Sequence, residues 1–321
     1  MRGMTWVLAS AALWMVSGVG AQDYPTRPIR MLIPQSPGGA QDTTARILTQ
    51  TISERVGWRF VIDNRAGAHG FIGVSIAAKG GPDGYTLLMA HTGEFAVNPA
   101  LFANVPYDLE RDFIPVTMVT DSPMLLIANP KMQITTFKAL VAMAKAKPGA
   151  VAYSSAGTGT INHLAGEWIA HAAGIKLLHV PYKGGAAAAA AVTGGEVVVG
   201  IASVAGAIGH VQVGRVRVVG VTTAKRMRAY PDWPTPEEGG IPGVDASIWV
   251  GLFAPKGVPR QIIDRLNAEV LRTLDLPEVR AKYAELGSET AGMSPAAFRE
   301  RIKKDLERYR TIVKASGITA E

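Results

Sequence analysis

The chain has 321 residues and no cysteine. Disulfide bonds, thiol nucleophiles and cysteine metal ligands are therefore excluded. A chain of this length buries a sizeable apolar core without covalent cross-links, so the absence of disulfides is compatible with an exported protein. At this length we expect two domains rather than one.

The sequence also lacks a concentrated basic region. Lysine and arginine number 33 against 26 aspartates and glutamates, and the excess is spread along the chain. A nucleic-acid-binding domain typically combines a basic stripe with a recognition helix or stacked aromatic side chains, and neither pattern occurs. We therefore expect no nucleic-acid partner, while the modest positive charge favours small anions.

Motifs of the common catalytic sites are missing as well. The sequence contains no G-x-x-x-x-G-K-[ST] phosphate loop and no G-x-S-x-G nucleophile elbow. Its six histidines have no metal-ligand spacing, so we expect no metal and no cofactor. Residues 157–159 begin like a dinucleotide fingerprint but lack its final glycine. These absences favour a binding protein over an enzyme.

The N-terminus has the pattern of a secretory signal peptide. Arg2 precedes an uncharged apolar stretch up to Val16, and small residues at 19–21 provide a cleavage site. We expect residues 1–21 to be removed after Ala21. The alternative is a retained membrane helix, for which the apolar stretch is short. Export through such a signal predicts a periplasmic location.

Residues 29–57 have the pattern strand, glycine turn, helix. The apolar run 29–33 predicts a buried strand, and the prolines and glycines at 34–39 forbid regular structure. A helical apolar period follows, and Gly57 is typical of a helix end. Such a turn directs backbone N–H groups toward a carboxylate or phosphate, although many α/β proteins have similar turns without that function.

The same pattern recurs along the chain. Turns at 64–70 and 91–94 follow the second and third predicted strands, and turns at 155–160 and 179–185 repeat the pattern in the second half. Alternating strands and helices predict an α/β protein with doubly wound parallel sheets, whose ligands bind beyond the carboxyl ends of the strands. Turns rich in N–H groups and hydroxyls, without a catalytic group, favour a carboxylate receptor.

Further elements are predicted by shorter signals. Apolar runs predict strands at 124–128 and 248–254, and helical periodicity predicts the last two helices at 260–274 and 295–315. Residues 106–115 are polar and marked by prolines, which predicts an irregular connection.

Four side chains in or near these turns have two interpretations. His69 and His163 are ligand contacts or ordinary turn and helix residues, with neither interpretation favoured. Glu94 either accepts a hydrogen bond from a ligand or is solvated, and we favour solvation. Asp42 either caps the first helix or faces the ligand, and capping is favoured because aspartate is common near helix starts.

Several motifs, in order from about Tyr24 to the C-terminus, resemble the Bug family, the extracytoplasmic solute receptors of tripartite tricarboxylate transporters. The motifs are Pro37-Gly38-Gly39 with Asp42, Asn64-Arg65 with Gly67 and Gly70, Pro82-Asp83-Gly84-Tyr85-Thr86-Leu87, Asn98-Pro99, Gly157-Thr158-Gly159 with His163-Leu164-Ala165-Gly166-Glu167, and Val180-Pro181-Tyr182-Lys183-Gly184-Gly185.

The resemblance implies a type II periplasmic-binding-protein fold, with two α/β domains and a ligand in the cleft between them. It places domain 1 at 22–123 plus 255–321 and domain 2 at 129–247. The crossover strands would be 124–128 and 248–254. Two domains joined by two strands should hinge and close on the ligand.

The resemblance also implies that ligand carboxylates are held by a first-domain turn at 36–42 and second-domain turns at 154–160 and 182–185. Two positions depart from the family pattern and bear on ligand identity: Gln35 and Ser36 replace an aromatic residue and a proline, and Gly195-Glu196-Val197-Val198 replaces Gly-Gln-Val-Asp. The expected ligand-binding residues are Gln35, Ser36, Gly38, Gly39, Gln41, Asp42, His69, Thr92, Ser154, Ser155, Gly157, Gly159, Thr160, His163, Tyr182, Lys183, Gly184, Gly185 and Ser203.

The leading hypothesis is a periplasmic receptor that captures a small organic carboxylate and delivers it to the integral-membrane subunits of a transporter. We expect backbone N–H groups and hydroxyls to hold the anion, and Arg46 to be uninvolved. One alternative is a secreted hydrolase using Ser154 or Ser155 with His163, for which the sequence offers no acid partner. Another is a ligand sensor that docks on a membrane signalling protein.

Overall fold

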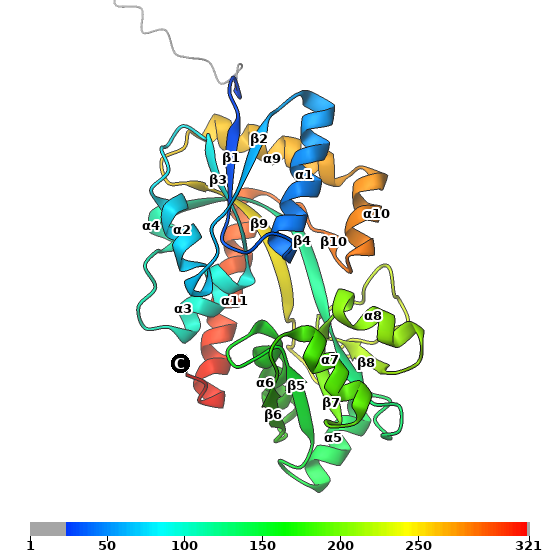
Figure 1. Cartoon of the computed structure of the whole chain (residues 1–321). Coiled ribbons are helices and arrows are strands. Elements are labelled where there is room, and N and C mark those ends of the chain that lie inside the picture. Colours follow the sequence, from blue (N-terminus) through cyan, green and yellow to red (C-terminus); the bar gives the residue numbers. More distant parts are fainter. Residues whose placement is uncertain (1–23, 320–321) are drawn as a thin grey trace, which may run out of the picture.

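The computed structural model describes residues 24–319, so the expected signal peptide at 1–21 lies outside the described residues. The chain begins with three parallel strands, β1 (Ile29–Ile33), β2 (Phe60–Asn64) and β3 (Thr86–His91), paired in the order β2-β1-β3 (Figure 1). Helices α1 (Ala40–Val56) and α2 (Phe71–Ala78) connect them. As predicted, α1 ends at Gly57, whose φ of 74° is left-handed.

Two long strands follow beside β3. β9 (Ser247–Pro255) lies between β3 and β4 (Phe113–Ala128) and is antiparallel to both. The first part of β4 pairs with β9, and its last residues, 124–128, pair with β7 and β8 instead. β4 and β9 therefore connect the two ends of one curled sheet.

The prediction of an irregular segment at 106–115 and a strand starting only at 124 is wrong in its boundaries, because β4 already begins at Phe113. Pro115 and Pro123 cannot donate ladder hydrogen bonds, which hid the strand in the sequence. The structure accommodates the first proline at a register shift between Pro115 and Thr117.

The second half of the chain builds the other end of the sheet. Its strands pair in the order β4-β7-β5-β6, and β8 pairs with β4. The β5 pairs are parallel and the β4 pairs are antiparallel, so the whole sheet is mixed rather than parallel throughout. The elements are β5 (Ala152–Ser155), β6 (Leu178–Pro181), β7 (Val199–Ser203), β8 (Arg217–Val221), α5 (Phe137–Ala146), α6 (Ile161–Ala173), α7 (Gly185–Gly194) and α8 (Val204–Gln212).

We call the part built on β1–β3 the first lobe and the part built on β5–β8 the second lobe. Helices α9 (Arg260–Leu274) and α10 (Pro277–Glu285) return to the first lobe, where both pack against α1. The domain boundaries expected from the sequence stay a prediction. Within residues 24–319, no helix is long and apolar enough to cross a membrane.

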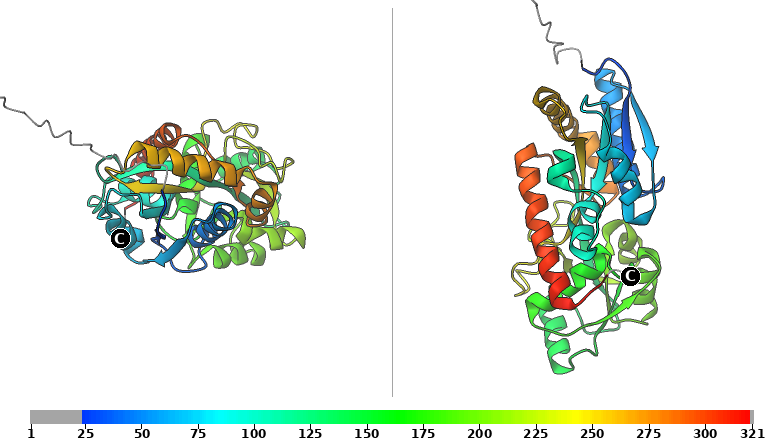
Figure 2. Two further views of the ribbon diagram at one scale, coloured as in Figure 1. Left: turned by 90° about the horizontal axis from the view of Figure 1, so that it is seen from above. Right: turned by 90° about the vertical axis from the view of Figure 1, so that its left-hand side faces the viewer.

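The last helix, α11 (Pro295–Ser316), contacts both lobes (Figure 2). Phe298 and Ile302, near its start, are buried in a core cluster with Trp249 and Phe253 of β9. Tyr309 and Ile312, near its end, are buried in the core of the second lobe. Besides β4 and β9, α11 is thus a further physical link between the lobes.

Candidate ligand-binding cleft

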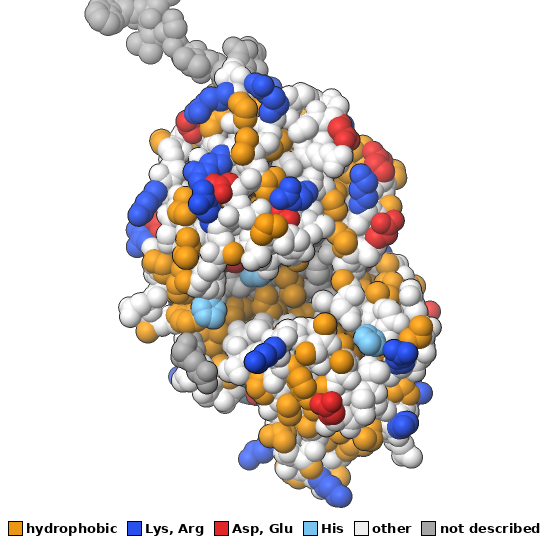
Figure 3. Space-filling model, viewed as in Figure 1, with side chains coloured by type: hydrophobic (Ala, Val, Ile, Leu, Met, Phe, Trp, Pro, Cys, Tyr) orange, Lys and Arg blue, Asp and Glu red, His pale blue; other side chains and the backbone are white. Residues whose placement is uncertain are grey.

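A cavity of about 630 Å³ lies between the two lobes. The space-filling view shows the hollow, with hydrophobic side chains in its depth (Figure 3). The turns after β1, β2 and β3 all line it, which confirms that the first-lobe turns meet at one edge of the sheet. Their lining residues are Pro34, Gln35, Ser36, Ala66, Gly67, His69, Gly70, His91, Gly93 and Glu94.

A helical segment after β3 forms the next part of the first-lobe wall. It comprises the π-helix η3 (Gly93–Val97) and the single turn α3 (Asn98–Leu101), and Val97, Asn98, Leu101 and Phe102 line the cavity. None of these four residues was predicted from the sequence as a ligand contact. Their signal was the helical spacing of Glu94, Asn98 and Leu101 directly after a strand end.

The second lobe contributes one turn to the cavity. Thr158, Gly159 and Thr160 follow β5, and Ile161 and Asn162 belong to the first turn of α6. The remaining lining residues are Ile248 of β9 and Thr319. Of the residues expected from the sequence, the cavity is lined by Gln35, Ser36, His69, Gly159 and Thr160.

In and near the turn before α1, the chain's own side chains accept hydrogen bonds from the N–H groups. Asp42 Oδ2 accepts from the Gly38 N–H at 2.9 Å, and Asp42 Oδ1 accepts from Asn64 Nδ2 at 3.1 Å. Gln35 Oε1 accepts from the Gln41 N–H at 3.2 Å. Asp42 is buried and does not line the cavity, so its carboxylate ties the turn to the helix instead of facing the cleft.

Arg46 completes the hydrogen bonds of Asp42. Its Nε lies 2.9 Å from Asp42 Oδ2, and its side chain is 52% exposed. Burial opposes the charge of Asp42, but the hydrogen bonds from Arg46, Gly38 and Asn64 hold the pKa of the carboxyl group below its usual value. Arg46 therefore contributes to the turn and does not line the cavity.

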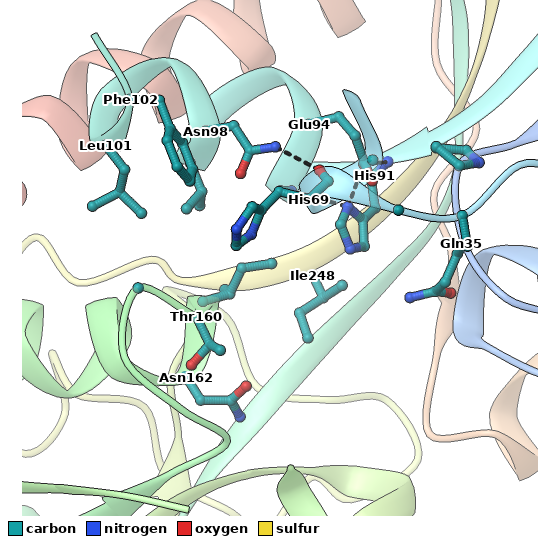
Figure 4. A pocket seen from close by; sticks show the side chains of 18 of the residues that line it. Gln35, His69, His91, Glu94, Asn98, Leu101, Phe102, Thr160, Asn162 and Ile248 are labelled. Carbon is teal, nitrogen blue, oxygen red and sulfur yellow. Dashed lines mark hydrogen bonds and ion pairs between the residues drawn. The ribbon is translucent and has the colours of Figure 1, made fainter. Parts of the chain in front are cut away.

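Glu94 is buried, so the expectation that it is solvated is wrong. Its Oε2 accepts from the His91 backbone N–H at 2.8 Å and from Gln41 Nε2 at 2.9 Å, and it forms an ion pair with His91 Nδ1 (Figure 4). Burial opposes protonation of the imidazole, but Glu94 raises the pKa of His91 above its ordinary value. The first-lobe wall thus contains a charged pair whose charges compensate each other.

His69 reaches the cavity from an unusual backbone. Ala68 and His69 have φ values of 46° and 55°, the left-handed region that non-glycine residues rarely adopt. Asn98 Nδ2 donates to the His69 carbonyl at 2.8 Å, and the His69 ring lies 4.9 Å from that of Phe102. These contacts hold the ring against the cavity (Figure 4).

His163 is neither a cavity residue nor a surface residue. It is 5% exposed, stacks on His179 with 3.6 Å between ring centroids, and accepts from the Gly159 N–H at 3.1 Å through Nδ1. Burial lowers the pKa of both histidines to about 4, and each ring is neutral at pH 7. The pair supports the second-lobe turn from behind.

The same geometry speaks against the hydrolase alternative. Ser155 is fully buried, and its hydroxyl lies 2.6 Å from His179 Nε2 rather than meeting His163. Ser154 is also buried and donates to the Ala188 carbonyl at 2.9 Å. A nucleophile must reach a substrate, and neither hydroxyl lines the cavity.

Other expected residues lie behind or beside the cavity. Thr92 is buried, and its hydroxyl accepts from the Trp249 N–H at 2.9 Å. Ser203 caps α8 by accepting from the Gly206 N–H at 3.1 Å. The turn at 182–185 adjoins the 155–160 turn, with Gly184 N donating to the Ala156 carbonyl. The expected residues that do not line the cavity are Gly38, Gly39, Gln41, Asp42, Thr92, Ser154, Ser155, Gly157, His163, Tyr182, Lys183, Gly184, Gly185 and Ser203.

The chain belongs to the tripartite tricarboxylate transporter receptor family, whose model matches residues 44–318. A protein from the tcbD–tcbE intergenic region of Pseudomonas sp. (strain P51) is 38% identical, over 97% of this chain and 94% of that protein. Protein BugT of Bordetella pertussis is 34% identical, over 98% of both chains. The resemblance to the Bug family is confirmed. The chain is thus a solute receptor and not an enzyme.

Solved structures of relatives share the fold. Rpa4515 of R. palustris, solved with adipate, is 32% identical with a TM-score of 0.77, covering 92% of this chain and 99% of that one. MatC of Rhodopseudomonas palustris, solved with bound malate, is 28% identical with a TM-score of 0.72, covering 90% and 100%. Other matching structures are described as periplasmic proteins. The periplasmic-binding-protein fold is therefore confirmed.

Proposed function

We propose that this receptor captures a small organic carboxylate between its lobes and delivers it to the membrane subunits of a tripartite transporter. The observation behind the proposal is the cavity itself, which is lined by turns at strand ends of both lobes. The relatives solved with adipate and malate support a carboxylate as the ligand class.

The second-lobe turn offers the anion a site. Ile161 and Asn162 are the first residues of α6, where backbone N–H groups have no intrahelical partner, and no described side chain accepts from them. The positive end of the helix dipole adds to these donors. Since no lysine or arginine among residues 24–319 lines the cavity, backbone groups rather than a side-chain salt bridge hold the anion.

The first lobe closes the site from the opposite side. Gln35, Ser36 and His69 line the cavity there. We expect the two domains at 22–123 plus 255–321 and at 129–247, with hinge movement about 124–128 and 248–254. Residues 1–21 are removed after Ala21 on export to the periplasm.

Thermal-shift screening of the mature chain, residues 22–321, against a panel of organic acids tests this function. A bound acid at 100 times its Kd adds about 2.7 kcal/mol to the free energy of unfolding, so the melting temperature must rise. A matched panel of amides and alcohols of the same carbon skeletons should give no shift. Absence of a shift with every acid would contradict the carboxylate receptor.

A further inference from the structure

We propose that the first lobe binds a second carboxylate of the ligand through Gln35 and His91, and that this contact requires a protonated His91. The inference rests on the proposed function and deepens it, because it names a further group of the ligand and the condition under which that group is bound. It follows from two side-chain nitrogen atoms of the first-lobe wall that have no partner among the described residues.

Gln35 presents its amide nitrogen to the cavity. Its Oε1 accepts from the Gln41 N–H at 3.2 Å, and because an N–H group can only donate, this bond fixes which end of the amide is the oxygen. The same oxygen lies over Gly39, where an added Cβ would be 2.2 Å away. Nε2 is therefore turned away from the α1 turn, and it points into the cavity (Figure 4). It offers two N–H donors to a ligand oxygen.

His91 presents a ring nitrogen to the same cavity. Its Nδ1 forms the ion pair with Glu94 Oε2, while its side chain is 20% exposed and lines the cavity. The Gly93 N–H lies 3.1 Å from Nδ1, but the carboxylate oxygen requires the proton to be on that nitrogen. Nε2 points away from Glu94 and has no partner among residues 24–319 (Figure 4). When both nitrogens are protonated, Nε2 is a charged donor, which binds a carboxylate more strongly than a neutral donor does.

The two nitrogen atoms lie across the cavity from the first anion site. Thr160 and Asn162, at the N-terminus of α6, lie on the second-lobe side (Figure 4). Gln35 and His91 lie on the first-lobe side, and Ile248 of β9 lies between the two sides. A ligand with a carboxylate at each end therefore contacts both lobes, with its carbon chain beside an apolar side chain.

Glu94 favours a positive charge on His91. Burial opposes protonation of the ring, but the carboxylate raises its pKa above the ordinary value. The titratable neighbours are Glu94 of η3 and His69 of the turn after β2. The packed elements α1 and β9 present the neutral Gln41 and Val250. A second carboxylate beside the ring raises the pKa of His91 further, so affinity for a diacid falls as the pH rises through the pKa of the free protein.

Calorimetric titration between about pH 6.5 and about pH 10 tests the inference with two pairs of acids, succinate with butyrate and adipate with hexanoate. The members of a pair have the same number of carbon atoms and differ by one carboxylate. In at least one pair, the wild type should bind the diacid about tenfold or more tightly than the monoacid at the lowest pH, a difference of about 1.4 kcal/mol. This affinity ratio should fall as the pH rises, because His91 loses its charge.

Variants assign the effect to the two side chains. His91→Gln should lower the ratio at the lowest pH and make it independent of pH. Glu94→Gln should move the fall of the ratio to lower pH, because His91 loses the carboxylate that raises its pKa. Gln35→Ala should lower the ratio about tenfold at every pH. The controls His171→Gln, at an exposed position of α6, and Gln50→Ala, at an exposed position of α1, should keep the ratios of the wild type.

The inference is overturned if the monoacids bind as tightly as the diacids, or if the wild-type ratio does not change with pH. It is also overturned if His91→Gln keeps the pH dependence in a protein that melts like the wild type. Binding of monoacids and diacids with equal affinity would leave the proposed carboxylate receptor intact, whereas failure of the whole acid panel would remove both.

Discussion

The N-termini of α1 and α6 follow similar glycine turns, yet they face the cleft differently. In the first lobe, Asp42 accepts a hydrogen bond from the Gly38 N–H of the turn, and Gln35, which lines the cavity, accepts one from the Gln41 N–H of α1. In the second lobe, Thr160 caps the His163 N–H but leaves the first N–H groups of α6 beside the cavity. We therefore expect a glycine turn to be a ligand site only where the chain's own side chains leave its donors free.

The histidines of the two lobes also lie in different environments. His91 of the first lobe is paired with Glu94, which raises its pKa although burial opposes this. His163 and His179 of the second lobe stack on each other, and burial lowers the pKa of each to about 4. The first-lobe wall therefore contains a fixed ion pair, and the second-lobe turn rests on neutral rings.

The largest expected effect is a loss of carboxylate affinity when the glycine turn before α6 is altered, compared with the same change in the turn before α1. Gly159 and Gly38 both have positive φ, 73° and 81°, so valine at either position strains the backbone by about 1–2 kcal/mol or more. Only at Gly159 would the new side chain meet Leu101 in the cavity. We expect Gly159→Val to weaken carboxylate binding more than about 100-fold, a loss above about 2.7 kcal/mol.

Gly38→Val is the matched control for that variant. Apart from its two chain neighbours, no described residue has an atom within 4 Å of its added Cβ, and Gly38 does not line the cavity. It should reduce stability in urea denaturation while calorimetric affinity stays within about threefold, or about 0.7 kcal/mol, of the wild type. An equal loss of affinity in both variants would show that the first-lobe turn also holds the anion.

Acid should destabilise the fold through the second-lobe histidines. Their folded pKa of about 4 lies below the ordinary value of 6.5, so between these values the unfolded chain binds protons that the folded chain does not. The contribution of these neutral histidines to the free energy of unfolding is complete above about pH 6.5 and is lost as the pH falls toward 4. Solvent screens His179, which is only half-buried, and this reduces the effect. We therefore expect the free energy of unfolding, measured by urea denaturation, to fall by about 2–3 kcal/mol between pH 6.5 and 4.

Two variants, His179→Gln and His91→Gln, test which histidines cause this loss of stability in acid. His179→Gln should flatten the loss of stability between pH 6.5 and 4 relative to the wild type. The raised pKa of His91 has the opposite sign: its contribution is present at low pH and is lost as the pH rises through the folded pKa. If His91→Gln flattened the acid limb instead, the assignment of the two histidine environments would be reversed.

Much of the fold was predictable because its signals are local. The apolar run of β1, the glycine stop at Gly57 and the exact bounds of α9 all follow from periodicity and turn chemistry. The first eleven residues of β4 were not predictable, since prolines interrupt their pattern. Helix α8 was missed because its Val, Ala and Gly residues show no clear helical period.

The site was predictable at the level of turns but not of side chains. Thr92 was expected to face the ligand, but it contacts β9, about 155 residues further along the chain, while its neighbours His91 and Glu94 face the cavity. Which residues at the end of a strand face a cleft depends on the elements that pack against the opposite face of that strand. The contact of His163 with His179 likewise depends on the parallel pairing of β5 with β6.

A smaller effect is expected from the cap of α6. The Thr160 hydroxyl donates to the Gly157 carbonyl at 2.7 Å and accepts from the His163 N–H at 3.3 Å. Thr160→Val removes both bonds and should cost about 1 kcal/mol of stability, and it should weaken ligand binding because the turn lines the cavity. Thr136→Val, which removes the cap of α5, should cost similar stability without loss of affinity. Equal affinity in the two variants would argue against a ligand on the α6 turn.

The smallest effect should come from Arg46, and it tests whether any side-chain cation holds the anion. The guanidinium is half exposed and pairs with Asp42 across one helical turn, so Arg46→Gln should change the free energy of unfolding by less than about 1 kcal/mol. Asp42→Ala should cost about 1–3 kcal/mol because the Gly38 N–H and the Asn64 amide lose their acceptor. Calorimetric affinity should be unchanged in Arg46→Gln. Loss of binding in that variant would mean that a salt bridge from the first lobe holds the carboxylate, and the contrast between the two helix N-termini would then not determine where the anion binds.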